Sequence, residues 1–147
     1  MKWITIAFLG LCFWQEAQAQ LSVGYFPFQS ILAITSNTEK RFWVDYKLET
    51  NGFVSNLNME LSPKWNFRKM DQVNYYTGMG LSFNPAYAFS DLSVVNGGFV
   101  EVGTRIKPLQ YYRNFQVIFE ISLYVNQALS GGNLRTRLGA AWNFQRR

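Results

Sequence analysis

The chain has 147 residues, 48% of them hydrophobic, and a formal net charge of +5 at pH 7. That length corresponds to one domain. The sequence has no histidine and one cysteine, which excludes an internal disulfide, the usual zinc ligands and the commonest general base of enzymes. The basic residues are dispersed rather than gathered in one patch, so we expect no nucleic-acid partner.

The first 19 residues have the features of a secretory signal peptide. A lysine follows the initial methionine, residues 3–13 form a short apolar core, and the Ala-Gln-Ala of residues 17–19 matches a signal-peptidase site. The core is too short to be a membrane-spanning helix. Cys12 lies inside this segment, so the mature chain has no cysteine. We expect residues 1–19 to be cleaved and residues 20–147 to form a single domain.

Residues 21–37 have the least regular pattern of the mature chain. Residues 21–27 alternate, and residues 31–35 form a second apolar run rich in β-branched side chains. These runs predict two short strands with a tight connection at residues 28–30; one long kinked strand is the alternative. Two strands bring the total to eight and one brings it to seven. Single-chain bacterial barrels have even strand numbers, so we predict eight.

Six further segments alternate between apolar and polar residues with the period of two that indicates β-strands. The longest alternation runs through residues 54–68, whereas ordinary soluble strands have about 5–6 residues. About 9–11 residues are enough for a tilted strand to cross a bilayer. Turn-forming residues such as Asn51-Gly52 separate the segments. The six predicted strands are residues 42–49, 54–68, 73–84, 99–107, 115–126 and 134–145.

The two faces of these strands differ in side-chain volume and charge. One face carries bulky apolar residues such as Phe42, Phe83 and Phe119, and the other carries glycines and ionisable residues. The interior of an eight-stranded barrel is just wide enough for its side chains, so the aromatic face would overfill it. We therefore predict an all-β fold, a closed antiparallel up-and-down transmembrane β-barrel with a polar, ion-paired interior. The predicted lumen network consists of Asp45, Lys47, Glu49, Glu60, Lys64, Arg68, Glu101, Arg105, Lys107, Glu120, Arg135 and Arg137.

Aromatic residues near the ends of segments predict a girdle at the membrane interface. The predicted girdle consists of Trp65, Phe67, Trp142 and Phe144. In the last segment, apolar residues occupy every second position and end at Phe144. This pattern resembles the C-terminal signal that the barrel insertion machinery of bacterial outer membranes recognises. That signal normally ends on the aromatic residue, whereas residues 145–147 follow here.

Together, the signal peptide, the alternating segments and the aromatic-terminated last strand resemble the small outer-membrane β-barrel proteins of the OmpA-transmembrane and OmpX type. The stretch Gly-Thr-Arg-Ile-Lys-Pro at residues 103–108 and the overall sequence pattern resemble those of uncharacterised barrels of the Bacteroidetes group. The resemblance covers the whole mature chain. It implies export to the outer membrane of a Gram-negative bacterium, with outer-membrane lipid around the barrel, and it rests on pattern rather than on a catalytic signature.

No group of residues predicts catalysis. Outer-membrane barrels that are enzymes, such as lipid A deacylases, phospholipases and proteases, rely on a histidine, which this chain lacks. Carboxylate pairs such as Asp45 and Glu49 would face a lumen rich in lysine and arginine, which predicts ion pairing rather than acid–base chemistry. We expect a non-enzyme with no catalytic residue, no cofactor and no metal.

We expect an integral outer-membrane protein with a structural, accessory or binding role, and a larger outer-membrane protein complex is a candidate partner. The alternatives are a secreted, soluble lipocalin-like barrel that binds an apolar ligand, and a small channel for hydrophobic solutes. With both termini periplasmic, four connections would face outward. Of these, only residues 85–96 form a substantial loop, and its apolar content suits contact with a partner.

The face assignment predicts different effects for two neighbouring substitutions. Leu61→Arg places a charge on the lipid face near mid-membrane and should lower the free energy of unfolding by about 2–4 kcal/mol. Glu60→Gln, on the lumen face, should have a much smaller effect. Denaturant unfolding of both variants in lipid vesicles measures the difference, and equal effects would show that the faces are assigned wrongly.

Overall fold

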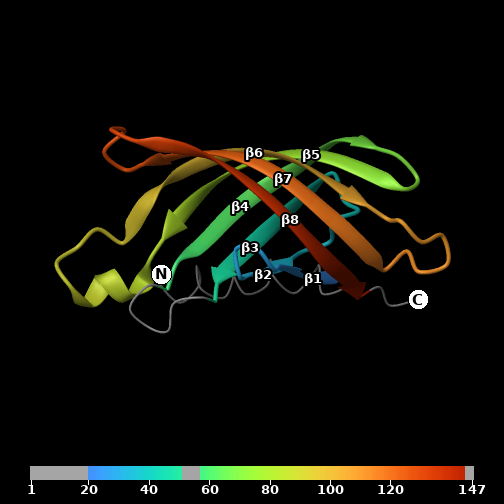
Figure 1. The fold of residues 1–147 in the computed structure, drawn as a ribbon, viewed down its shortest axis with the longest axis horizontal. Coiled ribbons are helices and arrows are strands. Elements are labelled where there is room, and N and C mark those ends of the chain that lie inside the picture. Colours follow the sequence, from blue (N-terminus) through green and yellow to red (C-terminus); the bar gives the residue numbers. More distant parts are fainter. Residues whose placement is uncertain (1–19, 51–56, 145–147) are drawn as a thin grey trace, which may run out of the picture.

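The computed structural model describes residues 20–50 and 57–144, and within them the chain forms eight strands and one short 3-10 helix, η1. Each strand pairs antiparallel with the next, and β8 pairs with β1, so the sheet closes into a barrel (Figure 1). The predicted closed, antiparallel, up-and-down fold is confirmed. The elements are β1 (Leu21–Phe26), β2 (Ile31–Thr35), β3 (Phe42–Glu49), β4 (Met59–Lys69), β5 (Val73–Phe83), η1 (Pro85–Phe89), β6 (Val95–Ile106), β7 (Phe115–Asn126) and β8 (Gly132–Phe144).

The irregular stretch at residues 21–37 forms two strands, as predicted. A turn at residues 27–30 joins them, in which the Gln29 N–H donates to the Phe26 carbonyl at 3.3 Å. Ser30 adopts a φ of 53°, in the left-handed region that lets a chain reverse sharply. The strand total is therefore eight rather than seven. The predicted signal peptide and the predicted turn at Asn51-Gly52 lie outside the described residues.

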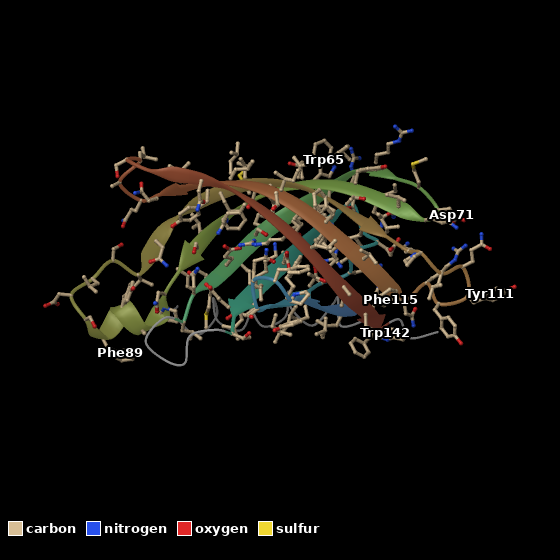
Figure 2. The ribbon with its side chains drawn as sticks, viewed as in Figure 1. Trp65, Asp71, Phe89, Tyr111, Phe115 and Trp142 are labelled. Atoms are coloured by element: carbon tan, nitrogen blue, oxygen red, sulfur yellow. The ribbon has the colours of Figure 1, made fainter. Side chains whose placement is uncertain are left out.

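The barrel has two distinct ends. We call the end that carries Leu21 and Phe144, which pair across the β1–β8 seam, the terminal rim, and the opposite end the loop rim. Asp71 and Tyr111 mark the terminal rim in Figure 2, and Phe89 marks the loop rim. The described connections are residues 36–41, 70–72 and 107–114 at the terminal rim, and residues 27–30, 84–94 and 127–131 at the loop rim.

Strand β6 begins earlier than predicted. The predicted strand covered residues 99–107, whereas residues 96–98 also lie inside β6, where Gly97 pairs with Ser82 of β5 and Asn126 of β7. A Cβ atom at Gly97 would lie 2.2 Å from the carbonyl oxygen of Val125. The glycine therefore permits a close approach of the neighbouring strand, which is a reason for glycine inside a strand as well as in a turn.

Glycines on the inward face make room for large rings. A Cβ atom at Gly103 would lie 2.5 Å from the Tyr76 ring, and one at Gly139 would lie 2.7 Å from the Phe26 ring. Both rings are fully buried. At these two glycines the rings pack directly on the backbone of the opposing strand. Such packing suits the narrow interior expected for eight strands.

The wall of the barrel is uneven in height. Strands β4 to β8 have 11 to 13 residues, whereas β1 has 6 and β2 has 5. Strand β8 pairs with β7 over most of its length but with β1 only from Ala140 to Phe144. The β1–β2 hairpin is therefore a low section of wall beside the long strand β8.

In the described part of the chain, no helix has both the length and the hydropathy needed to cross a membrane.

The packing of Tyr76 predicts a difference between two glycines of β6. Gly103→Ala should lower the free energy of unfolding by about 1–3 kcal/mol, because the new methyl group meets a ring that is buried on all sides. Gly98→Ala is the matched control: its Cβ would make only ordinary contacts, the nearest at 3.6 Å. Denaturant unfolding followed by tryptophan fluorescence measures both, and a larger loss for Gly98→Ala would contradict the inward placement of Gly103.

Candidate functional site

The centre of the lumen holds two ammonium groups among three carboxylates. Lys64 Nζ lies 2.6 Å from Asp45 Oδ2 and 2.6 Å from Glu120 Oε1. Lys47 Nζ lies 2.5 Å from Glu120 Oε2 and 3.2 Å from Glu101 Oε2. All five side chains are at most 2% exposed. We call these five residues the central cluster.

The central cluster forms because inward positions of β3, β4, β6 and β7 converge across the lumen. In the sheet, Gly78 of β5 lies between Lys64 and Glu101, since it pairs with both. A Cβ atom at Gly78 would lie 2.9 Å from Lys64 Cγ, so the glycine lets the lysine side chain lie over β5. The Lys64 ammonium group then reaches Glu101 Oε1 at 3.1 Å.

Two neutral side chains donate hydrogen bonds to two of the three carboxylates. The Ser62 hydroxyl donates to Glu101 Oε1 at 2.9 Å, and the Tyr76 hydroxyl donates to Glu120 Oε1 at 2.7 Å. Lys64 also lies over the Tyr76 ring, 4.7 Å from its centroid. These contacts matter because a buried charge is tolerated only when it is both paired and hydrogen-bonded.

A second group of charges lies nearer the loop rim. Arg137 donates two hydrogen bonds to the Glu60 carboxylate, at 2.8 and 2.9 Å, and Arg135 donates one at 2.7 Å. The Arg135 guanidinium group also lies over the rings of Phe99 and Tyr124, 5.2 and 4.7 Å from their centroids. We call Glu60, Arg135 and Arg137 the arginine cluster, in which two cations share one carboxylate.

Toward the terminal rim, a guanidinium group and an indole ring fill the lumen. Arg105 lies over the Trp43 ring, 4.8 Å from its centroid, and donates to Gln116 Oε1 at 3.2 Å. The Trp43 indole donates to Asn66 Oδ1 at 3.1 Å. The Trp43 indole N–H and Arg105 Nη1 therefore have hydrogen-bond partners, whereas Arg105 Nε has none among the described residues.

The terminal rim itself is covered by residues 36–41. Glu39 Oε1 lies 2.7 Å from Lys107 Nζ and accepts a hydrogen bond from Asn74 at 3.3 Å. The Lys69 ammonium group donates to the Glu39 carbonyl. The connection between β2 and β3 thus folds over the end of the lumen and is held there by charge.

Three carboxylates of the central cluster are close enough together to be considered as a metal site. One oxygen from each of Asp45, Glu101 and Glu120 lies within 4.8 Å of the others. Both lysine ammonium groups, however, contact all three carboxylates. A cation there would have to displace groups that already supply the compensating charge, so this donor set fits ion pairing better than metal binding.

With one exception, the residues of the predicted lumen network lie on the inward face. Arg68 is the correction: it is exposed and pairs with Tyr75, an outward-facing residue of β5. The register shifts between Asn66 and Arg68, so an extra residue in the bulge turns Arg68 to the outside. Lys69 takes the inward position, opposite Asn74. Glu49 lies at the loop-rim mouth of the lumen, beside Asn58 at 3.3 Å.

The sequence pattern did not reveal several members of these groups. Tyr76 and Trp43 lie on the inward face that the alternation indicates, but period alone does not identify their hydrogen-bond partners. Glu39 has no periodic signal, because it lies in a connection. The position of Glu39 at the end of the lumen could be inferred only from the fact that Lys107 needs a carboxylate partner.

The predicted girdle residues all lie on the outer surface close to the terminal rim. Trp65, Phe67, Trp142 and Phe144 are exposed, and Figure 2 shows Trp65 and Trp142 on different parts of that surface. Trp65 stacks on Phe42, with ring centroids 6.3 Å apart.

The arginine cluster revises the expected effect of Glu60→Gln. Glu60 is buried and is paired with both Arg135 and Arg137. Its neutralisation leaves two guanidinium groups without a carboxylate, which costs about 3–5 kcal/mol for a buried pair. This expected loss replaces the mild effect expected from the sequence pattern, which does not reveal how many cations one carboxylate serves, so a comparison of Glu60→Gln with Leu61→Arg no longer tests the assignment of the faces.

Comparison with known proteins returns no match: no protein-family model fits this chain, and no curated protein is significantly similar to it.

The central cluster predicts a large loss for Lys64→Met. Three carboxylates would then face one ammonium group, and breaking a buried ion pair in this way costs about 3–5 kcal/mol. Arg113→Met is the control, because the Arg113–Asp71 pair at the terminal rim is exposed and such a pair contributes about 0–1 kcal/mol. Guanidinium chloride unfolding of the two variants measures the difference; similar midpoints would contradict a stabilising role for the central cluster.

Proposed function

We propose that this chain is an integral outer-membrane β-barrel protein with a structural, accessory or binding role and no catalytic activity. The observation that carries the proposal is the polarity of the barrel, which is charged inside and apolar outside. Lysine, arginine and glutamate side chains are buried in the lumen, whereas each of the eight strands exposes large apolar side chains on its outer face (Figure 2). Water-soluble proteins rarely expose apolar surface on this scale, but lipid-facing walls require it.

Strand length and backbone pairing support the same proposal. Strands β4 to β8, with 11 to 13 residues, are long enough to cross a bilayer, which takes about 9–11. A closed barrel also pairs backbone groups between strands, as a hydrocarbon environment demands. The predicted signal peptide provides the route of export.

The soluble, lipocalin-like alternative receives less support. Such a barrel needs an apolar interior for its ligand and a polar outer face. Here an apolar ligand would meet the central cluster and the arginine cluster inside. The apolar layer of buried residues is small and consists of Phe26, Ile31, Ala33, Ile118 and Ala141.

The contacts of the buried ionisable groups support a role without catalysis. Each carboxylate of the central cluster contacts both ammonium groups. A carboxylate held in this way is a poor proton acceptor for a substrate, because accepting a proton would remove the charge that compensates the lysines.

The outer wall offers a surface for lipid or for a larger membrane protein. A groove of about 920 Å³ runs over β4 to β7, lined mainly by apolar side chains. Acyl chains of outer-membrane lipid fit this surface, and so does the apolar side of a partner in an outer-membrane complex. The barrel insertion machinery would recognise the last strand, β8, whose alternating apolar residues end at Phe144. The principal groove residues are Leu61, Met79, Leu81, Val100, Leu123 and Val125.

Cell fractionation tests the proposal directly. The full chain should sediment with the outer membrane and enter solution only with detergent, because its outer face is apolar. On a denaturing gel, the unboiled protein should migrate differently from the boiled protein, since a closed barrel resists unfolding by detergent alone. Recovery in the soluble periplasmic or secreted fraction without detergent would reject membrane insertion and favour the soluble alternative.

A further inference from the structure

Two arginines lie next to the aromatic residues on the outer surface at the terminal rim. The carbonyl oxygen of Arg41 accepts a hydrogen bond from the Asn66 N–H at 2.8 Å, and Arg68 follows Asn66 by two positions in β4. Positions in this diagonal relation are about 7–8 Å apart across neighbouring strands, which is within reach of long side chains. Both arginines are exposed. They therefore place two guanidinium groups near each other on the wall.

The bulge in β4 turns Arg68 to the outside. Without the extra residue, the alternation of β4 would direct Arg68 into the lumen, and Lys69 takes that inward position instead. A cation on the lipid-facing wall is costly near the middle of a bilayer but costs little at its interface. Arg68 is close to the end of its strand at the terminal rim. The bulge therefore places a cation at the level where lipid headgroups would lie.

Four aromatic rings lie beside these arginines. The Arg41 guanidinium group lies over the Trp65 ring, 5.7 Å from its centroid, and Trp65 stacks on Phe42. Phe67 and Tyr75 form a second pair, with ring centroids 6.4 Å apart. The contact with Trp65 orients the guanidinium group before any ligand binds. We call this group the rim surface; it consists of Arg41, Phe42, Trp65, Phe67, Arg68 and Tyr75.

The described residues do not compensate the positive charge of the rim surface. The two carboxylates of the described connections at this rim are paired with other cations, Glu39 with Lys107 and Asp71 with Arg113. The acidic residues of β3 and β4 lie in the lumen or at its mouth, and β5 has none. Neither arginine of the rim surface forms an ion pair with a described carboxylate, so both can donate to an anion. The described connections at the loop rim, by contrast, contain no lysine or arginine.

The outer wall changes in chemical character from the terminal rim toward the middle of the barrel. The two arginines come first and the four rings next, and the exposed aliphatic side chains of Val44, Leu61 and Met79 follow. A glycerophospholipid has the same order, with its phosphate first, then the glycerol esters and then the acyl chains. A lipid aligned with the barrel would thus meet a matching surface along its whole length.

We propose that the rim surface binds an anionic phospholipid, with its phosphate between Arg41 and Arg68 and its acyl chains on the rings and the aliphatic wall. Guanidinium groups donate strong, charge-assisted hydrogen bonds to phosphate oxygens and match their geometry. A zwitterionic headgroup is less suitable, because it brings an ammonium group to a surface that already has two cations. This site rests on the proposed membrane insertion, and it gives the binding role of the barrel a chemical class of ligand.

Brominated lipids test the site, because bromine on an acyl chain quenches the fluorescence of a tryptophan that it contacts. The mature chain contains Trp43, Trp65 and Trp142. Trp43 is buried in the lumen, so a Trp142→Phe background leaves Trp65 as the reporter of lipid contact. This protein is reconstituted in vesicles that mix phosphatidylglycerol and phosphatidylcholine, with bromine on one lipid at a time. We expect phosphatidylglycerol to be preferred at Trp65 by about fivefold for each arginine, and equal quenching by the two lipids would overturn the proposal.

Two variants and one control locate the site. In the same background, Arg41→Gln and Arg68→Gln should each lower the preference for phosphatidylglycerol about fivefold. Arg113→Gln removes an exposed cation at the same rim that is paired with Asp71, and it should leave the preference unchanged. An unchanged preference in both site variants, or an equal fall in the control, would reject the rim surface as the binding site.

Two further measurements separate the ways in which the proposal could fail. Inorganic phosphate should not displace phosphatidylglycerol more than chloride does at the same ionic strength; specific displacement would show a site for free anions and reject the role of the lipid. The heat shift on a gel and the need for detergent are recorded on the same samples. A folded, membrane-inserted barrel without lipid preference therefore rejects this site alone, whereas a protein soluble without detergent rejects the proposed function.

Discussion

The attraction between two buried ammonium groups and three buried carboxylates determines much of how this barrel is built. Moving any one of these charges out of water costs several kcal/mol, so none of them is stable in the lumen without the others. Their mutual contacts connect β3, β4, β6 and β7 across the interior. The inward glycines follow from the same constraint, because the lysine stems and the Tyr76 ring need the volume that side chains at Gly78 and Gly103 would take.

This interior also determines the outer surface. A lumen filled with charges and the rings that border them has little room for aliphatic side chains, so leucine, valine and phenylalanine residues lie outside. Water-soluble proteins rarely present such a surface, whereas a bilayer favours it. The proposed location therefore depends on what the narrow interior accepts, more than on any single residue of the wall.

The alternation of the sequence predicted the strand number, the closure and the direction of nearly every side chain, because a strand has a strict period of two. It failed where that period is interrupted. The bulge after Asn66 reverses the direction of Arg68, and nothing in the local sequence marks the extra residue. The predicted strand at residues 99–107 began too late, because the glycines before it are equally compatible with a turn and with a close contact between strands. Glu39 was missed because connections have no period, and the division of the lumen charges into separate groups depends on distances between strands that are far apart in sequence.

The seam between β1 and β8 has mechanical consequences for the whole molecule. It joins the two ends of the sheet through five paired positions, from Leu21 with Phe144 to Tyr25 with Ala140, whereas β7 and β8 share eleven. A force pulling the termini apart acts on this short ladder first. The same ladder pairs residues that are far apart in the sequence, so its closure has a larger loop-entropy cost than the pairing of neighbouring strands. Because it has fewer paired positions than the neighbouring ladder of β7 and β8, this seam is the line along which the cylinder would open.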